Sequence, residues 1–301
     1  MAAEVSLVDR LRASAKYGRF CDETLQRVAD WAVRRAVSDK DAYERAKRKL
    51  HQACGAFLTR RDLGRAGETL ASLRHDMEPE ELRETCTDLL RCHVSTRARI
   101  PMLETLYTQL FAVTGMPASV LDIGCGLHPA ALPWMGLSKE TCYLAIDADR
   151  ALAALVGELF RRLRVPGKAR AQDVIVEPPR ERADLVFLLE LLPALEQQEK
   201  GAGFRLLEQL DFSSAIVSFP TRTLSGRAKN LSEHHARLLM SLAERCHWKS
   251  TPIRFPSEPA AEPHPNEPAA EPHPNEPAAE PHPNEPAAEP HPNEVFIVVQ
   301  K

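Results

Sequence analysis

Two glycines and a later aspartate form the stretch of this sequence best suited to hold a small ligand. Gly124 and Gly126 end the segment Ser119-Val-Leu-Asp-Ile-Gly-Cys-Gly126, and Asp147 ends Cys142-Tyr-Leu-Ala-Ile-Asp147. Because glycine lacks a Cβ atom, a turn built from it lets the backbone approach a ligand closely. Asp147 follows Gly126 by 21 residues, close to the spacing at which a carboxylate meets a ribose in nucleotide-binding α/β proteins.

The turn lacks the third glycine of the dinucleotide-binding pattern. Leu127, His128 and Pro129 follow Gly126 instead. Since that glycine belongs to the sites that hold a pyrophosphate, its absence disfavours NAD and an NAD-dependent oxidoreductase. The pattern favours a ligand that carries an adenosine but no pyrophosphate, chiefly S-adenosylmethionine.

Short apolar runs alternate with helical patterns from residue 119 onward. This order predicts an α/β domain with a parallel sheet and crossover helices. In such open sheets, ligands bind outside the carboxyl ends of the strands. The expected strands are 120–123, 143–146, 168–171, 183–190 and 214–219, and the expected helices are 151–163 and 204–210. The residues expected at the strand ends are Gly124, Asp147, Asp173, Leu188 to Glu190 and Arg222.

The N-terminal part of the chain is helical in pattern and basic. The chain has a net charge of -3, but residues 1–65 hold 15 Lys/Arg against nine Asp/Glu. Clustered cations of this kind suit a phosphate-facing surface. The candidates for RNA contact are Arg45, Lys47, Arg48, Lys49, Arg60 and Arg61. A solvated helix face is the alternative interpretation for each of them.

Arg99 precedes a predicted helix at 102–113 and allows two interpretations. A guanidinium binds a carboxylate through two parallel hydrogen bonds, so Arg99 is a candidate for the carboxylate of an amino-acid-like ligand. The alternative is an ordinary partner in a surface ion pair.

A nine-residue unit, Glu-Pro-Ala-Ala-Glu-Pro-His-Pro-Asn, occurs four times without change from 258 to 293. Its three prolines exclude a helix or a central strand. The four histidines repeat every nine residues, roughly 28 Å apart in polyproline II, so they cannot share a metal in that state. We expect a tolerated spacer, inserted in a closing hairpin made by 248–255 and 295–299.

The remaining composition points to an intracellular protein without a structural metal. Seven cysteines occur without Cys-x-x-Cys spacing, which argues against a disulfide framework and a zinc site. No apolar run of 18 residues occurs, so we expect no membrane span. We expect a cytoplasmic monomer that binds no metal.

Several blocks of the chain together resemble the aminoglycoside-resistance 16S ribosomal RNA methyltransferases of the Arm/Rmt group, which modify N7 of guanosine 1405. His-x-Ser-Thr and Ser-Phe-Pro-Thr-Arg are specific to this group, whereas Gly-Cys-Gly is shared by many methyltransferases. Phe57 stands where some relatives have Tyr, and the repeat is not part of the family pattern. The matching blocks are 16–17, 50–57, 93–99, 120–129, 172–173, 191–193 and 218–229.

The resemblance implies a Rossmann-like S-adenosylmethionine-dependent methyltransferase domain at 111–301, preceded by a helical ribosome-docking domain at 1–110. It implies that the methionine end of the cofactor meets His93, Val94, Ser95 and Arg99. Asp147 would hold the ribose, and Gln172 with Asp173 the adenine. It further implies that Phe57, Gly124, Leu188 and Gln197 complete the cofactor pocket, and that Arg222, Arg227 and Lys229 lie near the target nucleotide.

The implied reaction is methylation of guanosine 1405 in the 30S subunit, which gives resistance to kanamycin- and gentamicin-type aminoglycosides. Guanine N7 carries a free lone pair, so we assign no general base and no catalytic residue. Two alternatives remain open: a related methyltransferase that acts on another RNA position or a small molecule, and a ribosome-binding protein without catalysis.

Overall fold

The N-terminal unit is a small bundle of three helices. The computed structural model describes residues 5–52, 58–220, 230–253, 255 and 294–301. The bundle consists of α1 (Leu7–Arg12), α2 (Asp22–Val33) and α3 (Asp39–Leu50). Ser6 and Ser38 cap α1 and α3 by accepting hydrogen bonds from backbone N–H groups, as serine commonly does at this position. The three helices enclose a core of their own, around Leu11, Phe20 and Leu25.

A seven-stranded sheet forms the centre of the rest of the chain. Its strand order is β3-β2-β1-β4-β5-β7-β6, with β1 to β5 parallel and β7 antiparallel to both of its neighbours. This confirms the five predicted parallel strands and the closing hairpin. The strands are β1 (Ser119–Ile123), β2 (Cys142–Asp147), β3 (Gly167–Ala171), β4 (Ala183–Leu189), β5 (Phe212–Pro220), β6 (Lys249–Ile253) and β7 (Glu294–Gln300).

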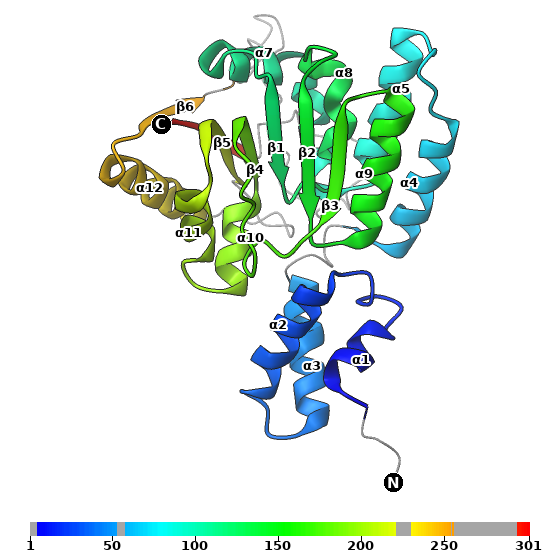
Figure 1. The fold of residues 1–301 in the computed structure, drawn as a ribbon, viewed down its shortest axis with the longest axis vertical. Coiled ribbons are helices and arrows are strands. Elements are labelled where there is room, and N and C mark those ends of the chain that lie inside the picture. Colours follow the sequence, from blue (N-terminus) through cyan, green and yellow to red (C-terminus); the bar gives the residue numbers. More distant parts are fainter. Residues whose placement is uncertain (1–4, 53–57, 221–229, 254, 256–293) are drawn as a thin grey trace, which may run out of the picture.

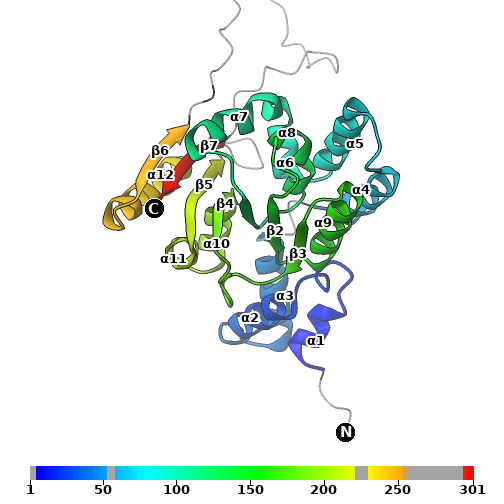
Figure 2. The same ribbon diagram turned by 45° about the horizontal axis from the view of Figure 1, so that its top comes forward.

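Helices cover both faces of the sheet (Figures 1 and 2). Along β4, Leu185 and Phe187 face one core, whereas Val186 and Leu188 face the other. Burial on both faces explains why β2, β4 and β5 read as largely apolar runs, whereas the edge strand β3 alternates, with Lys168 and Arg170 exposed. The first face carries α4 (Arg60–Ser72), α5 (Pro79–Arg91), α7 (Leu103–Thr114), α8 (Leu132–Met135) and α9 (Arg150–Leu163), and the second carries α10 (Leu191–Gln198), α11 (Ala202–Gln209) and α12 (Asn230–Arg245). Short connecting helices are α6 (Val94–Arg99), η2 (Ile100–Met102) and η3 (His128–Ala131).

The hydrophobic cores divide the chain well before residue 110. Apolar side chains of α4, α5 and α7 share one core with the sheet, while α1 to α3 enclose a core that, among the described residues, includes no strand. The periodicity that predicts these helices gives each an apolar stripe but does not say which stripe packs on which. In packing terms, the helical unit that stands apart from the sheet is therefore α1 to α3.

This three-helix unit lies beyond the carboxyl ends of the parallel strands (Figure 1). Backbone hydrogen bonds attach it there: Cys21 N donates to Ala148 O at 2.9 Å, and Arg150 N donates to Arg19 O at 2.8 Å. The unit is thus fixed to the edge at which open α/β sheets bind their ligands.

Candidate cofactor and RNA sites

The turn after β1 depends on its two glycines. Gly124 and Gly126 have φ angles of 65° and 51°, in the left-handed region that suits glycine. The backbone N–H groups of Gly124 and Cys125 both donate to Ile146 O, at 2.8 and 3.1 Å. A Cβ atom at Gly124 would lie 2.7 Å from Leu191 Cδ1. The glycine turn therefore lies close to the end of β2, and no side chain of Gly124 or Gly126 fills the space in front of the turn.

Gly124→Ala is expected to weaken the binding of S-adenosylhomocysteine by about tenfold and to lower the free energy of unfolding by about 1–3 kcal/mol. The new methyl group would force Leu191, which lines the pocket, out of its place. Calorimetric titration and denaturant unfolding measure the two effects. Gly136→Ala is the matched control, because Gly136 has a φ of 61° but nothing within 4 Å of an added Cβ atom. Equal affinities in the two variants would contradict the prediction.

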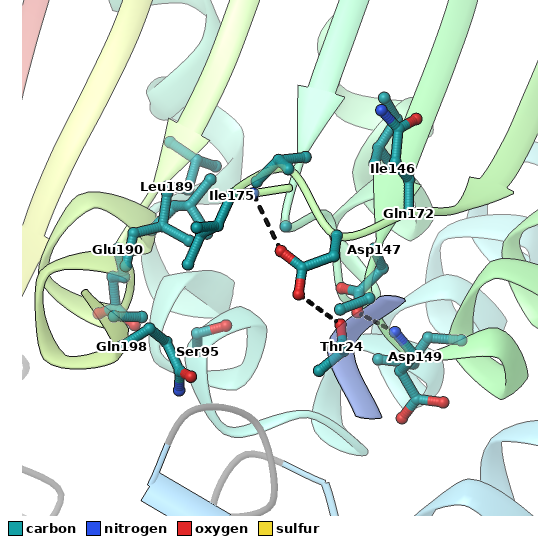
Figure 3. A pocket seen from close by; sticks show the side chains of 18 of the residues that line it. Thr24, Ser95, Ile146, Asp147, Asp149, Gln172, Ile175, Leu189, Glu190 and Gln198 are labelled. Atoms are coloured by element: carbon teal, nitrogen blue, oxygen red, sulfur yellow. Dashed lines mark hydrogen bonds between the residues drawn. The ribbon is translucent and has the colours of Figure 1, made fainter. Parts of the chain in front are cut away.

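A pocket opens at the strand ends in front of this turn (Figure 3). Of the residues expected to bind the cofactor, it brings together His93, Ser95, Gly124, Asp147, Gln172 and Asp173. Other lining residues, which the sequence does not single out as ligand contacts, include Thr24, Arg27, Asp149, Ile175, Leu195 and Gln198. The apolar members suit a flat ring, and the carboxylates suit hydroxyl and amino donors.

Asp147, at the end of β2, is held by backbone donors. Its Oδ2 accepts from Gly126 N at 3.0 Å, and its Oδ1 accepts from Asp149 N at 2.9 Å. Burial, followed by repulsion from Asp149, raises the pKa of Asp147 to about 6. Each oxygen keeps capacity for a further donor, so the carboxylate can accept the two hydroxyls of a ribose.

The affinity for S-adenosylhomocysteine is expected to fall about tenfold as the pH drops from 7 to 5. With a pKa of about 6, the free protein increasingly holds a proton on Asp147 below that pH. Because the hydroxyl donors favour the ionised carboxylate, binding must then release this proton. Titrations in buffers of different ionisation enthalpy would report both the affinity and the released proton. Asp147→Asn should bind weakly and without this pH dependence; a flat wild-type profile would contradict the prediction.

Asp173 follows β3 and is 3% exposed. Its Oδ1 accepts from Ile175 N at 3.0 Å, in its own loop. Its Oδ2 accepts from Thr24 Oγ1 at 2.8 Å and pairs with Arg27 Nη2 at 2.7 Å. Thr24, labelled in Figure 3, reaches this pocket from α2 of the three-helix unit.

His93, the residue just before α6, packs against the glycine turn. Its Nε2 would lie 3.0 Å from a Cβ atom at Gly126, and its Nδ1 forms a 3.0 Å hydrogen bond with Ser95 Oγ. Burial, followed by the charge of Arg99, lowers the pKa of His93 to about 3. The ring is therefore neutral at physiological pH and contributes shape and hydrogen bonds.

Arg99 is buried and does not line the pocket. Its Nε and Nη2 each donate to Glu294 at 2.7 Å, which makes a bidentate pair. Glu294 also accepts from the Ser218 hydroxyl at the end of β5. The contact observed for Arg99 matches the second interpretation, an ion pair, but this pair is buried and does not lie at the surface. The sequence gives no sign of it, since 195 residues separate the partners.

Of the other expected cofactor contacts, Val94, Leu188 and Gln197 do not line this pocket. Leu188 is fully buried in the core behind it, and Val94 is half-buried. Gln197 is exposed, and its neighbour Gln198 lines the pocket. Phe57 lies outside the described residues.

The candidate RNA contacts separate into paired and exposed side chains. Arg45 and Lys47 pair with Asp41 and Glu44 of their own helix, each at 2.8 Å. Lys49 donates to Gln197 O at 3.1 Å, so it joins the three-helix unit to the sheet domain.

Arg48, Arg60 and Arg61 are exposed. Arg60 and Arg61 begin α4, where cations are unfavourable because the helix dipole is positive at that end. Helix stability does not explain them, which favours a role in binding. Arg222, Arg227 and Lys229 lie outside the described residues.

Within the described ranges, no helix is both long and apolar enough to cross a membrane. Among the same residues, no group of three or more histidine, cysteine or acidic side chains is placed to hold a metal.

The chain is similar to solved rRNA methyltransferase structures over its whole length. The 16S rRNA methyltransferase RmtF in complex with S-adenosyl-L-homocysteine superposes with a TM-score of 0.76 and 27% identity, over 100% of this chain and 99% of that one. The 16S rRNA methylase RmtB superposes with a TM-score of 0.73 and 25% identity, over 98% and 97%. These matches confirm the predicted α/β methyltransferase fold.

Sequence relatives agree with this likeness. A 16S rRNA (guanine(1405)-N(7))-methyltransferase of Frankia casuarinae is 32% identical over 256 residues, 82% of this chain and 90% of the relative. A protein of the same name from Serratia marcescens is 33% identical over 224 residues, 74% and 83%. The profile of the ribosomal RNA methyltransferase (FmrO) family matches residues 13–259. The resemblance inferred from the sequence is confirmed: the chain belongs to the ribosomal RNA methyltransferase (FmrO) family.

Proposed function

We propose that the protein transfers a methyl group from S-adenosylmethionine to N7 of guanosine 1405 in 16S rRNA of the 30S subunit. The proposal rests on the pocket in which Asp147 and Asp173 face one cavity beside the glycine turn, in a chain of this family. We further propose that it acts as a monomer in the cytoplasm, where the ribosomes are. The methyl group would confer resistance to kanamycin- and gentamicin-type aminoglycosides.

The residues of the pocket fit S-adenosylmethionine. Asp147 would accept hydrogen bonds from the ribose hydroxyls, and Asp173 with Gln172 would meet the adenine. His93 and Ser95 would face the methionine end, with Arg99 and its partner Glu294 behind them. The cofactor supplies, when bound, a methyl group on a cationic sulfur.

The charge of the lining suits this cation. Asp147, Asp149, Asp173 and Glu190 line the pocket against a single arginine, Arg27, among the described lining residues. Acidic groups favour a cationic sulfur, and they also favour the cationic base that methylation of N7 produces.

No described residue has to remove a proton, because guanine N7 attacks with a free lone pair. The protein's task is to hold N7 in line with the methyl group. N7 faces the deep and narrow major groove of A-form RNA, so the base must leave its stack to reach the pocket. The exposed Arg48, Arg60 and Arg61 would hold the surrounding phosphates.

The test is methyl transfer from labelled S-adenosylmethionine to intact 30S subunits and to naked 16S RNA, followed by cleavage mapping of N7-methylguanosine. We expect one modified position, guanosine 1405, on 30S subunits only. Asp147→Asn serves as the control with impaired cofactor binding. A different modified nucleotide would overturn the assigned target, and binding to 30S subunits without cofactor binding or transfer would favour a non-catalytic ribosome-binding protein.

A further inference from the structure

We infer that Arg27 and Thr24 of α2 are positioning residues that orient the Asp173 carboxylate toward the adenine amine of the cofactor. The inference deepens the proposed function, because it rests on S-adenosylmethionine as the ligand of this pocket. It assigns to the three-helix unit a part in cofactor recognition in addition to its proposed part in RNA docking.

The contacts divide the two oxygens of Asp173 between two parts of the chain. Oδ2 accepts from Thr24 Oγ1 at 2.8 Å and from Arg27 Nε at 2.9 Å, and it lies 2.7 Å from Arg27 Nη2. Oδ1 accepts from Ile175 N at 3.0 Å. Oδ2 is thus occupied by α2, whereas Oδ1 retains a lone pair for one more donor. An adenine amine is a donor of this kind.

Arg27 is well suited to hold this carboxylate in one orientation. The side chain of Arg27 is 19% exposed and that of Asp173 is 3% exposed, so water competes little for either charge. The planar guanidinium fixes the direction of its hydrogen bonds more firmly than an ammonium does. Arg27 also donates to Gln198 Oε1 at 3.4 Å. It therefore links two side chains of the pocket wall.

The position of α2 is itself fixed by contacts on both sides of the pocket. Cys21 N, just before the helix, donates to Ala148 O at 2.9 Å. On the other side, Lys49 of the adjacent α3 donates to Gln197 O at 3.1 Å. Because α2 is anchored at the edge of the sheet where the pocket lies, the donors of Thr24 and Arg27 have fixed positions. They can therefore hold the Asp173 carboxylate in one orientation.

Arg27→Gln is expected to raise the dissociation constant for S-adenosylhomocysteine by about 10–100-fold, since it removes charge-assisted hydrogen bonds to a buried carboxylate. Thr24→Val, which removes a neutral hydroxyl donor, is expected to raise it by about 2–10-fold. Thr24→Ser keeps the hydroxyl and should restore the wild-type value. Arg12→Gln is the matched control: it removes the same charge from the same unit, where the described partners of Arg12 are Asp9 and Asp22.

A second ligand separates positioning from general damage to the fold. In the analogue of S-adenosylhomocysteine whose base is unsubstituted purine, a hydrogen replaces the adenine amine and N1 remains an acceptor, so Asp173 gains no donor from it. Wild-type protein should prefer S-adenosylhomocysteine over this analogue, and Arg27→Gln and Thr24→Val should lose most of that preference. A purely structural role would weaken the binding of both ligands by the same factor. Calorimetry with the two ligands, and unfolding midpoints of the free variants, provide the readout.

Unchanged affinity and unchanged preference in folded Arg27→Gln and Thr24→Val would overturn the inference, as would an equal loss of affinity for both ligands.

The outcome of this binding test is separate from the outcome of the test of the proposed function. If wild-type protein binds S-adenosylhomocysteine but does not methylate guanosine 1405, the function fails while the binding test still decides the role of α2. If methylation occurs at guanosine 1405 and Arg27→Gln keeps its ligand preference, the inference alone fails.

Discussion

Glu294→Gln is expected to lower the free energy of unfolding by about 3–5 kcal/mol, because it leaves the buried guanidinium of Arg99 without its counter-charge. The two side chains are only 4% and 5% exposed, so water cannot replace the lost partner. Burial by itself lowers the pKa of Arg99, but Glu294 more than offsets this and raises it. For a chain of this size the unfolding midpoint should fall by roughly 10 °C.

Two further variants make this prediction specific to the buried pair. Glu208→Gln removes an exposed partner of Arg245 and should cost less than about 1 kcal/mol. Arg99→Met combined with Glu294→Leu should regain much of the stability, because no charge is then left buried alone. Denaturant unfolding measures all three proteins. The prediction is wrong if Glu294→Gln is as stable as Glu208→Gln.

Replacing Arg48, Arg60 and Arg61 together by glutamine is expected to weaken binding to 30S subunits by about 10–100-fold at moderate salt. Each lost phosphate contact should also reduce the slope of log affinity against log salt by about one unit. These side chains are exposed and have no part in the pocket lining, so the affinity for S-adenosylhomocysteine should not change. Sedimentation or filter binding over a range of salt concentrations provides the measurement.

The matched control replaces three exposed arginines of the sheet domain. Arg74, Arg161 and Arg245 are each more than 60% exposed, and each pairs with an acidic neighbour. Their replacement by glutamine removes the same charge. If this control variant reduces the slope of log affinity against log salt as much as the first triple variant does, binding to the 30S subunit depends on net charge. The assignment of Arg48, Arg60 and Arg61 as phosphate contacts is then wrong.

The sheet was predictable because the signals for it are local. A strand buried on both faces needs a largely apolar run, and β2, β4 and β5 each have one, while β1 has apolar residues on either side of the buried Asp122. The glycine turn is local too, since the φ angles of Gly124 and Gly126 depend on their own lack of a side chain. The position of Asp147 at the end of β2 follows from the end of the apolar run 143–146.

The packing of the helices was not predictable in the same way. An amphipathic pattern marks the buried stripe of a helix but not the surface that covers it. The helices α4 and α5 are amphipathic in the same way as α2 and α3, yet they share a core with the sheet, whereas α1 to α3 form their own.

The type of sheet, the glycine turn and the carboxylates at the strand ends can all be read from the sequence, because neighbouring residues define each of these. The contacts of those carboxylates and of Arg99 become visible in the packed fold alone. Thr24 lies 149 residues from Asp173, and Arg99 lies 195 residues from Glu294. Such pairs depend on how separate elements pack, and the charge of one residue does not identify its distant partner.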